Sequence, residues 1–112
     1  MDLITWNDFE KLEIRVGHII AVNDFPKALK PAYKLVIDFG DQIGQKNSSA
    51  QITYHYNKED LLNMQVIAVV NFPPKRIAGF ISECLVLGIY DENNNVILLK
   101  PDKPVKNGQK IG

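Results

Sequence analysis

The sequence is poor in cysteine, long hydrophobic runs and net charge, and each shortage excludes a class of protein. Its single cysteine, Cys84, cannot form a disulfide within the chain. No apolar run approaches the roughly 18 residues that a membrane-spanning helix needs. Its 13 basic and 13 acidic residues cancel, which excludes the wholly basic surface of an indiscriminate polyanion binder. The opening MDLITWNDFEKLEI lacks the basic and apolar regions of a signal peptide, so we expect a cytoplasmic protein.

The composition that remains is that of a small globular protein. The chain has 112 residues, of which 46% are hydrophobic and 23% charged, and it contains no repeat, low-complexity tract or linker. We therefore expect a single domain over residues 1–112. A domain of this size buries only part of its apolar surface, so an oligomeric partner would stabilise it.

Short β-type segments dominate the chain. Residues 14–22 (IRVGHIIAV) are rich in β-branched types, and residues 33–40 (YKLVIDFG) alternate so that Leu35, Ile37 and Phe39 share one face. Further runs predict strands over 48–54, 65–72, 83–90 and 95–100. The sequence DENNN between the last two runs predicts a turn.

Two short helices are predicted. Trp6, Phe9 and Leu12 have helix-like spacing ahead of the first strand, and Asn57 can cap a helix near residues 57–63. The C-terminal PDKPVKNGQKIG is turn-rich and reads as an extension. Short strands with one brief helix between the third and fourth predict a mainly β fold, the five-stranded Greek-key barrel of the oligonucleotide-binding (OB) type.

Basic residues gather where such a barrel binds its ligands. OB barrels use the face of their second and third strands and the loops joining the first strand to the second and the fourth to the fifth. These two loops carry Lys27, Lys30, Lys34, Lys75 and Arg76. The two prolines before Lys75 fix φ, and we expect them to hold Lys75 and Arg76 out on a stiff turn as phosphate contacts. The alternative for all these cations is an ordinary solvated loop.

Aromatic and polar residues near these loops have two readings each. Phe72 and Phe80 flank the basic turn and are candidates for stacking unpaired bases, or else they close the end of the barrel. Ser48, Ser49 and Gln51, on the predicted third strand, are candidates for contacts with phosphates or base edges, or else they form a polar edge strand.

Residues for catalysis or metal binding are not grouped in the sequence. Cys84 lies in an apolar run with no nearby histidine, and His18 and His55 are isolated in different segments. This pattern suggests neither a nucleophile with its base nor a metal cluster. Residues 40–44 (GDQIG) have two glycines and precede no helix, so they predict a turn and not a phosphate-binding loop. We expect no enzyme activity, cofactor or metal.

Several segments also resemble CsaA-type proteins of the tRNA-binding-domain family in order and spacing. They are FEKLEIRVGHI, PAYKLVIDFG, SSAQIT, VIAVVNFPPKRIAGF, SECLVLG and PDKPVKNGQKIG, and the likeness runs from Asp8 to Gly112. The resemblance implies a cytoplasmic homodimer of OB barrels that binds tRNA and acts as a chaperone for unfolded or export-destined polypeptides. A tRNA-binding module with no chaperone role is the alternative.

The resemblance also extends the candidate sites. Asn71 stands at the asparagine that ends the fourth strand in the family, Arg76 stands in its basic loop, and Ser82 and Glu83 stand at its Ser-Glu pair, so it implies RNA binding at these positions. It further implies that the terminal segments form the dimer interface. The stripe of Trp6, Phe9 and Leu12 fits such an interface, because we expect one small barrel to leave part of it uncovered.

Overall fold

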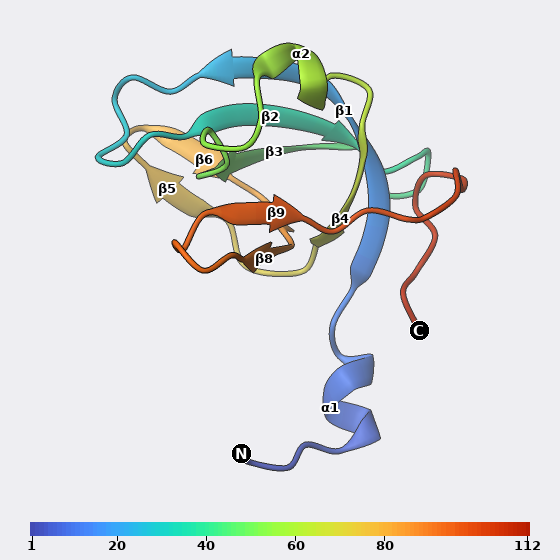
Figure 1. Ribbon diagram of the computed structural model, residues 1–112. Helices are drawn as coiled ribbons and strands as arrows, with labels where there is room; N and C mark the ends of the chain where they lie inside the picture. Colours follow the sequence, from blue (N-terminus) through green and yellow to red (C-terminus); the bar gives the residue numbers. More distant parts are fainter.

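Five strands form the central antiparallel sheet of the computed structural model, which describes residues 1–112 (Figure 1). In sheet order they are β3 (Gln45–Ala50), β2 (Tyr33–Asp38), β1 (Ile14–Asp24), β4 (Gln65–Val69) and β7 (Leu85–Val86). The predicted alternation in β2 is confirmed, since Leu35, Ile37 and Phe39 are at most 1% exposed and form the centre of the core.

The sheet curls into a nearly closed barrel because the outer edge of β3 meets the segment just before β7. The Glu83 N–H donates to the Asn47 carbonyl at 2.8 Å, and the Asn47 N–H donates to Glu83 Oε1 at 3.0 Å. The Ser49 N–H donates to Ser82 Oγ at 3.1 Å. One backbone hydrogen bond and two hydrogen bonds to side chains thus join the edge of β3 to residues 82–83, and the predicted OB-type barrel is confirmed.

The third strand begins earlier than predicted. A turn with left-handed backbone at Gly40 (φ +90°) and Gly44 (φ +81°) reverses the chain, so Gln45 already pairs with Asp38. The predicted turn over 40–44 is confirmed, while the strand predicted over 48–54 is wrong in its bounds because polar residues supply the first half of β3. Gln51 consequently lies just beyond the strand.

The strand predicted over 83–90 is also wrong, because the chain forms two short strands there. β7 pairs with β4, whereas β8 (Gly88–Tyr90) pairs with β9 (Val96–Leu98) through the predicted DENNN turn. Leu87 lies between them, donating its N–H to the Ile67 carbonyl at 2.8 Å. The Leu87 carbonyl accepts the Leu99 N–H at 3.1 Å, so from this residue on the chain pairs with the segment of β9 instead of β4 and makes a separate hairpin.

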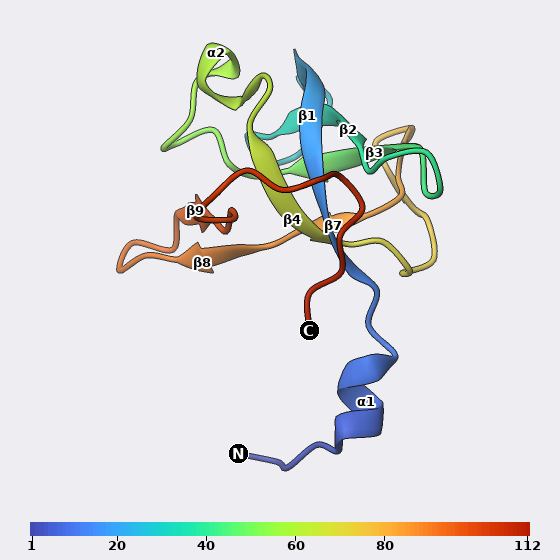
Figure 2. The ribbon, with the colours of Figure 1, turned by 90° about the vertical axis from the view of Figure 1, so that its right-hand side faces the viewer.

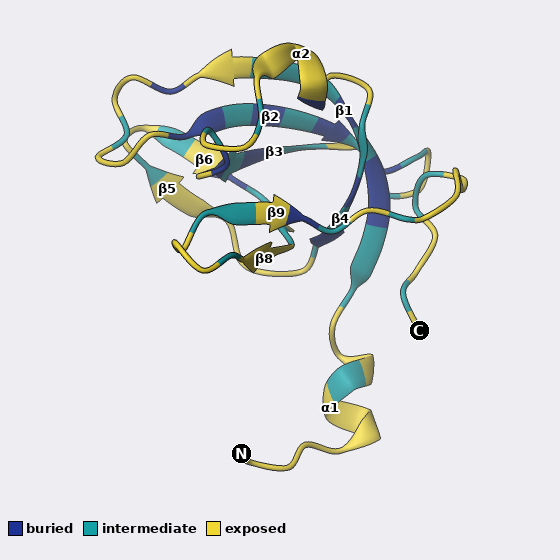
Figure 3. Ribbon diagram, viewed as in Figure 1, coloured by how far each residue is buried: buried dark blue, intermediate teal, exposed yellow.

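Two short helices flank the barrel, and neither has the length or apolar run needed to cross a membrane. α2 (Lys58–Leu61) lies within the predicted range, begins after Asn57, and buries Leu61 completely. α1 (Trp6–Glu10) is capped by Thr5, but it has no buried residue and stands away from the barrel (Figures 2 and 3).

The C-terminal extension runs beside the first half of β1. The Gly108 N–H donates to the Val16 carbonyl at 2.6 Å, the Val16 N–H to the Gln109 carbonyl at 3.0 Å, and the Ile111 N–H to the Ile14 carbonyl at 2.9 Å. The extension therefore satisfies backbone groups that β2, paired only with the second half of β1, leaves free.

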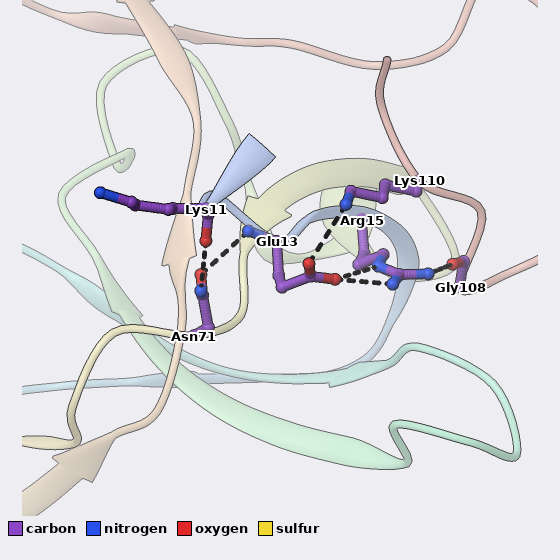
Figure 4. A network of polar contacts seen from close by, with 6 residues as sticks. All are labelled: Lys11, Glu13, Arg15, Asn71, Gly108 and Lys110. Atoms are coloured by element: carbon purple, nitrogen blue, oxygen red, sulfur yellow. Dashed lines mark hydrogen bonds and ion pairs between the residues drawn. The ribbon is translucent and has the colours of Figure 1, made fainter. Parts of the chain in front are cut away.

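An ion cluster ties this extension to the start of β1 (Figure 4). Glu13 Oε1 accepts from Arg15 Nη2 at 2.6 Å, and Glu13 Oε2 accepts from Lys110 Nζ at 3.2 Å. Arg15 also donates to the Gly108 carbonyl at 2.9 Å. The hydrogen bonds from Arg15 and then Lys110 lower the pKa of Glu13.

This lowered pKa predicts a difference in acid stability. Because the Glu13 carboxylate is favoured in the folded state, its contribution is complete above its ordinary pKa of 4.5 and is lost as the pH falls through the folded-state value. We expect Glu13→Gln to be less stable than wild type near neutral pH, with the gap closing below about pH 4.5. Urea titrations across pH test this, with Glu10→Gln as the control. A gap that stays constant to pH 3 would contradict the prediction.

Candidate nucleic-acid interface

An open groove of about 1180 Å³ crosses one side of the barrel. Its lining comes from the β1–β2 loop, the end of β3, the hairpin of β5 (Lys75–Ile77) with β6 (Phe80–Ser82), and the β8–β9 hairpin. Small-molecule pockets hold about 300–1,000 Å³, so this groove suits a longer ligand. Thirteen of its 22 lining residues are hydrophobic, which gives it apolar surface as well as charge.

The groove brings together most of the residues predicted to contact RNA. Those lining it are Lys30, Ser49, Gln51, Phe72, Lys75, Arg76, Ser82 and Glu83. Those that do not line it are Lys34, Ser48, Asn71 and Phe80.

The prediction that Lys75 and Arg76 lie on a turn is wrong. Both residues belong to strand β5, and both are exposed. Ile77 pairs with Phe80, so the reversal occupies only Ala78 (φ +47°) and Gly79 (φ +84°). Two consecutive left-handed residues form the tight turn that matches strand twist, and glycine accepts this backbone without strain. The cations are therefore held by strand pairing.

The electrostatics of the groove favour an anion. Lys30, Lys75 and Arg76 are exposed, and none of them takes part in the ion pairs of the molecule. Glu83 is the one acidic residue in the lining, and its carboxylate accepts the Asn47 N–H. A locally positive surface on a chain of zero net charge is the pattern that attracts phosphate selectively.

The structure gives two of the predicted RNA-binding serines a part in closing the barrel. Ser48 is 1% exposed and donates to the Cys84 carbonyl at 3.1 Å. Ser82 is buried too, and its Oγ accepts the Ser49 N–H. Ser48 is too buried to reach RNA while the barrel is closed. Ser49 and Gln51 remain at the groove.

Asn71 holds the N-terminal segment. Its Oδ1 accepts the Glu13 N–H at 3.0 Å, and its Nδ2 donates to the Lys11 carbonyl at 2.8 Å (Figure 4). Both ends of the amide are thus used to fasten the link between α1 and β1 to the end of β4. RNA binding by Asn71 stays a prediction.

Lys34 and Phe80 belong to a cluster at the turn end of the β5–β6 hairpin. The rings of Phe25 and Phe80 meet edge to face with centroids 5.5 Å apart, and Lys34 Nζ lies 5.6 Å and 5.8 Å from these centroids. This geometry favours the reading of Phe80 as a residue that closes the barrel end. Phe72, in contrast, is 49% exposed and available to a ligand.

Three further groove residues were not predicted from the sequence. Leu29 and Tyr90 are largely exposed, and Asn94 lies in the DENNN turn. The DENNN turn is the signal that could have found Tyr90 and Asn94, because a hairpin there sets Tyr90 opposite Val96, on the same face. No comparable signal marks Leu29, which lies in the β1–β2 loop.

The titratable residues considered for catalysis are engaged elsewhere. Burial raises the pKa of the Cys84 thiol to about 11, so the thiol is neutral at physiological pH. His18 Nδ1 lies 2.6 Å from Asn107 Nδ2, and His55 Nε2 lies 2.8 Å from Asp91 Oδ2. No three His, Cys, Asp or Glu side chains gather in a metal-binding arrangement.

Comparison with known proteins agrees with this geometry. The family model of putative tRNA-binding domains matches residues 14–110. The methionine–tRNA ligases of Pyrococcus horikoshii and Thermococcus onnurineus are 40% and 39% identical to the chain over 111 residues. These residues are 99% of this chain but only 15% of either ligase.

Two solved structures resemble the chain over nearly its whole length. The CsaA chaperone protein from Picrophilus torridus is 60% identical with a TM-score of 0.92, and the match covers 98% of this chain and 100% of that one. The chaperone CsaA from Bacillus anthracis is 50% identical with a TM-score of 0.93, covering 99% and 100%. The chain therefore belongs to the tRNA-binding-domain family, as a CsaA-type protein.

Proposed function

We propose that the protein binds tRNA in the groove as a non-catalytic homodimer of the cytoplasm, with Lys30, Lys75 and Arg76 contacting phosphates. The observation that carries the proposal is the set of three exposed, unpaired cations on one groove of a neutral chain. Cations already engaged with carboxylates would gain little from phosphate. Strand pairing holds the backbone of Lys75 and Arg76, so these two residues lose less backbone entropy on binding than residues of a mobile loop.

Substituting both hairpin cations tests the proposal. We expect Lys75→Ala/Arg76→Ala to weaken the binding of different tRNAs by similar factors, because phosphate contacts carry little sequence information. The slope of log affinity against log salt should fall by roughly 1.4 to 1.8, the counterion release of two phosphates. Fluorescence anisotropy with labelled tRNA across a salt series measures both quantities.

A matched control separates local contacts from total charge. Lys100→Ala/Lys103→Ala removes the same charge from exposed residues outside the groove and should leave the salt slope unchanged. Folding of both variants is checked by circular dichroism, since exposed cations contribute little to stability. Equal slopes for the hairpin variant and wild type would refute the phosphate site.

A second function, binding of unfolded or export-destined polypeptides, is favoured by the apolar part of the groove lining. The two CsaA proteins whose structures resemble this chain are chaperones. Apolar peptide binding should depend weakly on salt, whereas tRNA binding should depend on it steeply. Binding of an unfolded apolar peptide that survives in the hairpin variant would support a chaperone role separate from RNA. If no such peptide binds wild type, the protein is a dedicated tRNA-binding module.

The homodimer is supported by the N-terminal segment, residues 1–12. Trp6 is 67% exposed and its ring lies 5.3 Å from that of Phe9, while Leu12 is 36% exposed. Leu3 and Ile4 are still more exposed. An apolar stripe that stands away from its own barrel is suited to pack on a second copy of the chain.

A further inference from the structure

The β8–β9 hairpin presents different chemistry on its two faces. Side chains alternate across a strand, so Tyr90 and its partner Val96 share one face while Ile89 and its partner Ile97 share the other. Tyr90 and Val96 line the groove, and the two isoleucines do not. The hairpin thus places an aromatic ring that is 73% exposed at the groove.

This end of the groove has no charged side chain. The residues that the β8–β9 hairpin contributes to the lining are Tyr90, Asn94 and Val96, whereas the β5–β6 end contributes Lys75 and Arg76. An exposed ring beside an amide and an apolar side chain matches a nucleobase, which has a π-face to stack and polar edges to hydrogen-bond. The basic β5–β6 end matches the phosphates of the same RNA strand.

The backbone that carries Tyr90 is fixed by its neighbour Asp91. Asp91 Oδ1 accepts the N–H groups of Asn93 and Asn95, each at 2.9 Å, and Asp91 Oδ2 lies 2.8 Å from His55 Nε2. These contacts close the turn and fasten the hairpin to the segment after β3. A stacking ring on a fixed backbone binds with a smaller entropy loss than one on a mobile loop.

We propose that the β8–β9 end of the groove is a nucleobase subsite, in which Tyr90 stacks on an unpaired base and Asn94 contacts its edge. The inference rests on the proposed function, because the phosphates of the same RNA occupy Lys75 and Arg76. It adds a base contact to a site otherwise defined by charge. The expected ligand is RNA with an unpaired nucleotide, since a base within a duplex does not offer its face.

Substitutions at Tyr90 test the subsite by affinity and salt dependence together. Tyr90→Ala is expected to weaken tRNA binding about 5- to 150-fold, the range for losing a stacked base. The salt slope should not change, because stacking releases no counterions. Tyr90→Phe keeps the ring and should bind like wild type. Tyr54→Ala is the matched control, since Tyr54 is also 73% exposed but does not line the groove.

The contact of Asn94 is tested by Asn94→Gly, which keeps its left-handed backbone (φ +63°) and removes only the amide. The loss of one hydrogen bond should weaken tRNA binding about 2- to 10-fold. If Asn94→Gly weakened tRNA binding more than this and also weakened the binding of an unfolded apolar peptide, the turn itself would have changed. That result would overturn the role of Asn94.

A spectroscopic measurement distinguishes a base from a phosphate at Tyr90. In Tyr90→Trp, tRNA should quench the added indole fluorescence, whereas inorganic polyphosphate should not, with wild type recording the signal of Trp6. The subsite would be overturned if Tyr90→Ala bound tRNA as tightly as wild type does. A Tyr90→Ala variant that lost only the binding of an unfolded peptide would overturn it too. Weaker tRNA binding in Tyr90→Ala, with an unchanged slope in Lys75→Ala/Arg76→Ala, would instead uphold the base contact and refute the phosphate contacts.

Discussion

Deletion of residues 1–12 is expected to convert a homodimer into a monomer, so that the sedimenting mass falls to slightly below the 12.7 kDa of one chain. The physical reason is the exposure of Trp6, which is 67% exposed, on a helix that has no buried residue and carries the half-buried Phe9 beside it. About a twofold axis both copies would bury the same residues. Burial of a large apolar side chain contributes about 1.5–3 kcal/mol, so the two Trp6 rings of a dimer would contribute about 3–6 kcal/mol, and the half-buried Phe9 would add less.

Point substitutions sharpen this experiment. Trp6→Ala/Phe9→Ala should raise the dimer dissociation constant by about 100-fold or more, as the lower limit of that free energy requires. Asn7→Ala/Glu10→Ala changes other exposed residues of the same helix and should leave the dimer intact. Sedimentation at micromolar concentration measures each variant. A wild type that sediments as a monomer, or a deletion variant that keeps the mass of a dimer, would contradict the proposal.

The sequence predicted the parts of the fold that depend on local pattern. Alternation in β2 and the capping residue of α2 are short-range signals, and both led to the observed elements. β3 was misplaced because its first residues, QKNSS, are polar, and only pairing with β2 makes them a strand. The break between β7 and β8 likewise depends on a change of pairing partner from β4 to β9, which residues 83–90 do not encode.

The same distinction applies to the site. The basic residues Lys30, Lys75 and Arg76 of the groove were predicted from the sequence, because charge is visible there and the barrel order predicts which connections flank the ligand. The roles of Asn71 and Lys34 could not be predicted, because each depends on residues elsewhere in the chain. Asn71 bonds to the backbone of Lys11 and Glu13, and Lys34 lies over the rings of Phe25 and Phe80. Tyr90 was missed for a related reason, since its exposure at the groove follows from a hairpin that was predicted as a barrel strand.

Phe39→Ala is expected to destabilise the fold more than any substitution at the groove. Phe39 is 1% exposed and lies where β1 leaves room for it: a Cβ on Gly17 would come within 2.7 Å of its ring. Its N–H donates to the Gly44 carbonyl at 3.0 Å and so closes the β2–β3 turn. Phe→Ala substitutions in cores cost about 3–5 kcal/mol, because lost burial and an unfilled cavity add.

Such a loss is a large fraction of the roughly 5–15 kcal/mol by which a domain is stable. The free energy of unfolding falls by about 1–3 kcal/mol per molar of urea, so the urea concentration at the unfolding midpoint should fall by about 1 M or more. Phe72→Ala is the matched control, because the same atoms are removed from a ring that is 49% exposed. All variants are compared at one protein concentration, since dimerisation would otherwise shift the midpoint. Equal midpoints for the Phe39 and Phe72 variants would show that the core does not depend on Phe39, because the barrel would then have repacked without leaving a cavity.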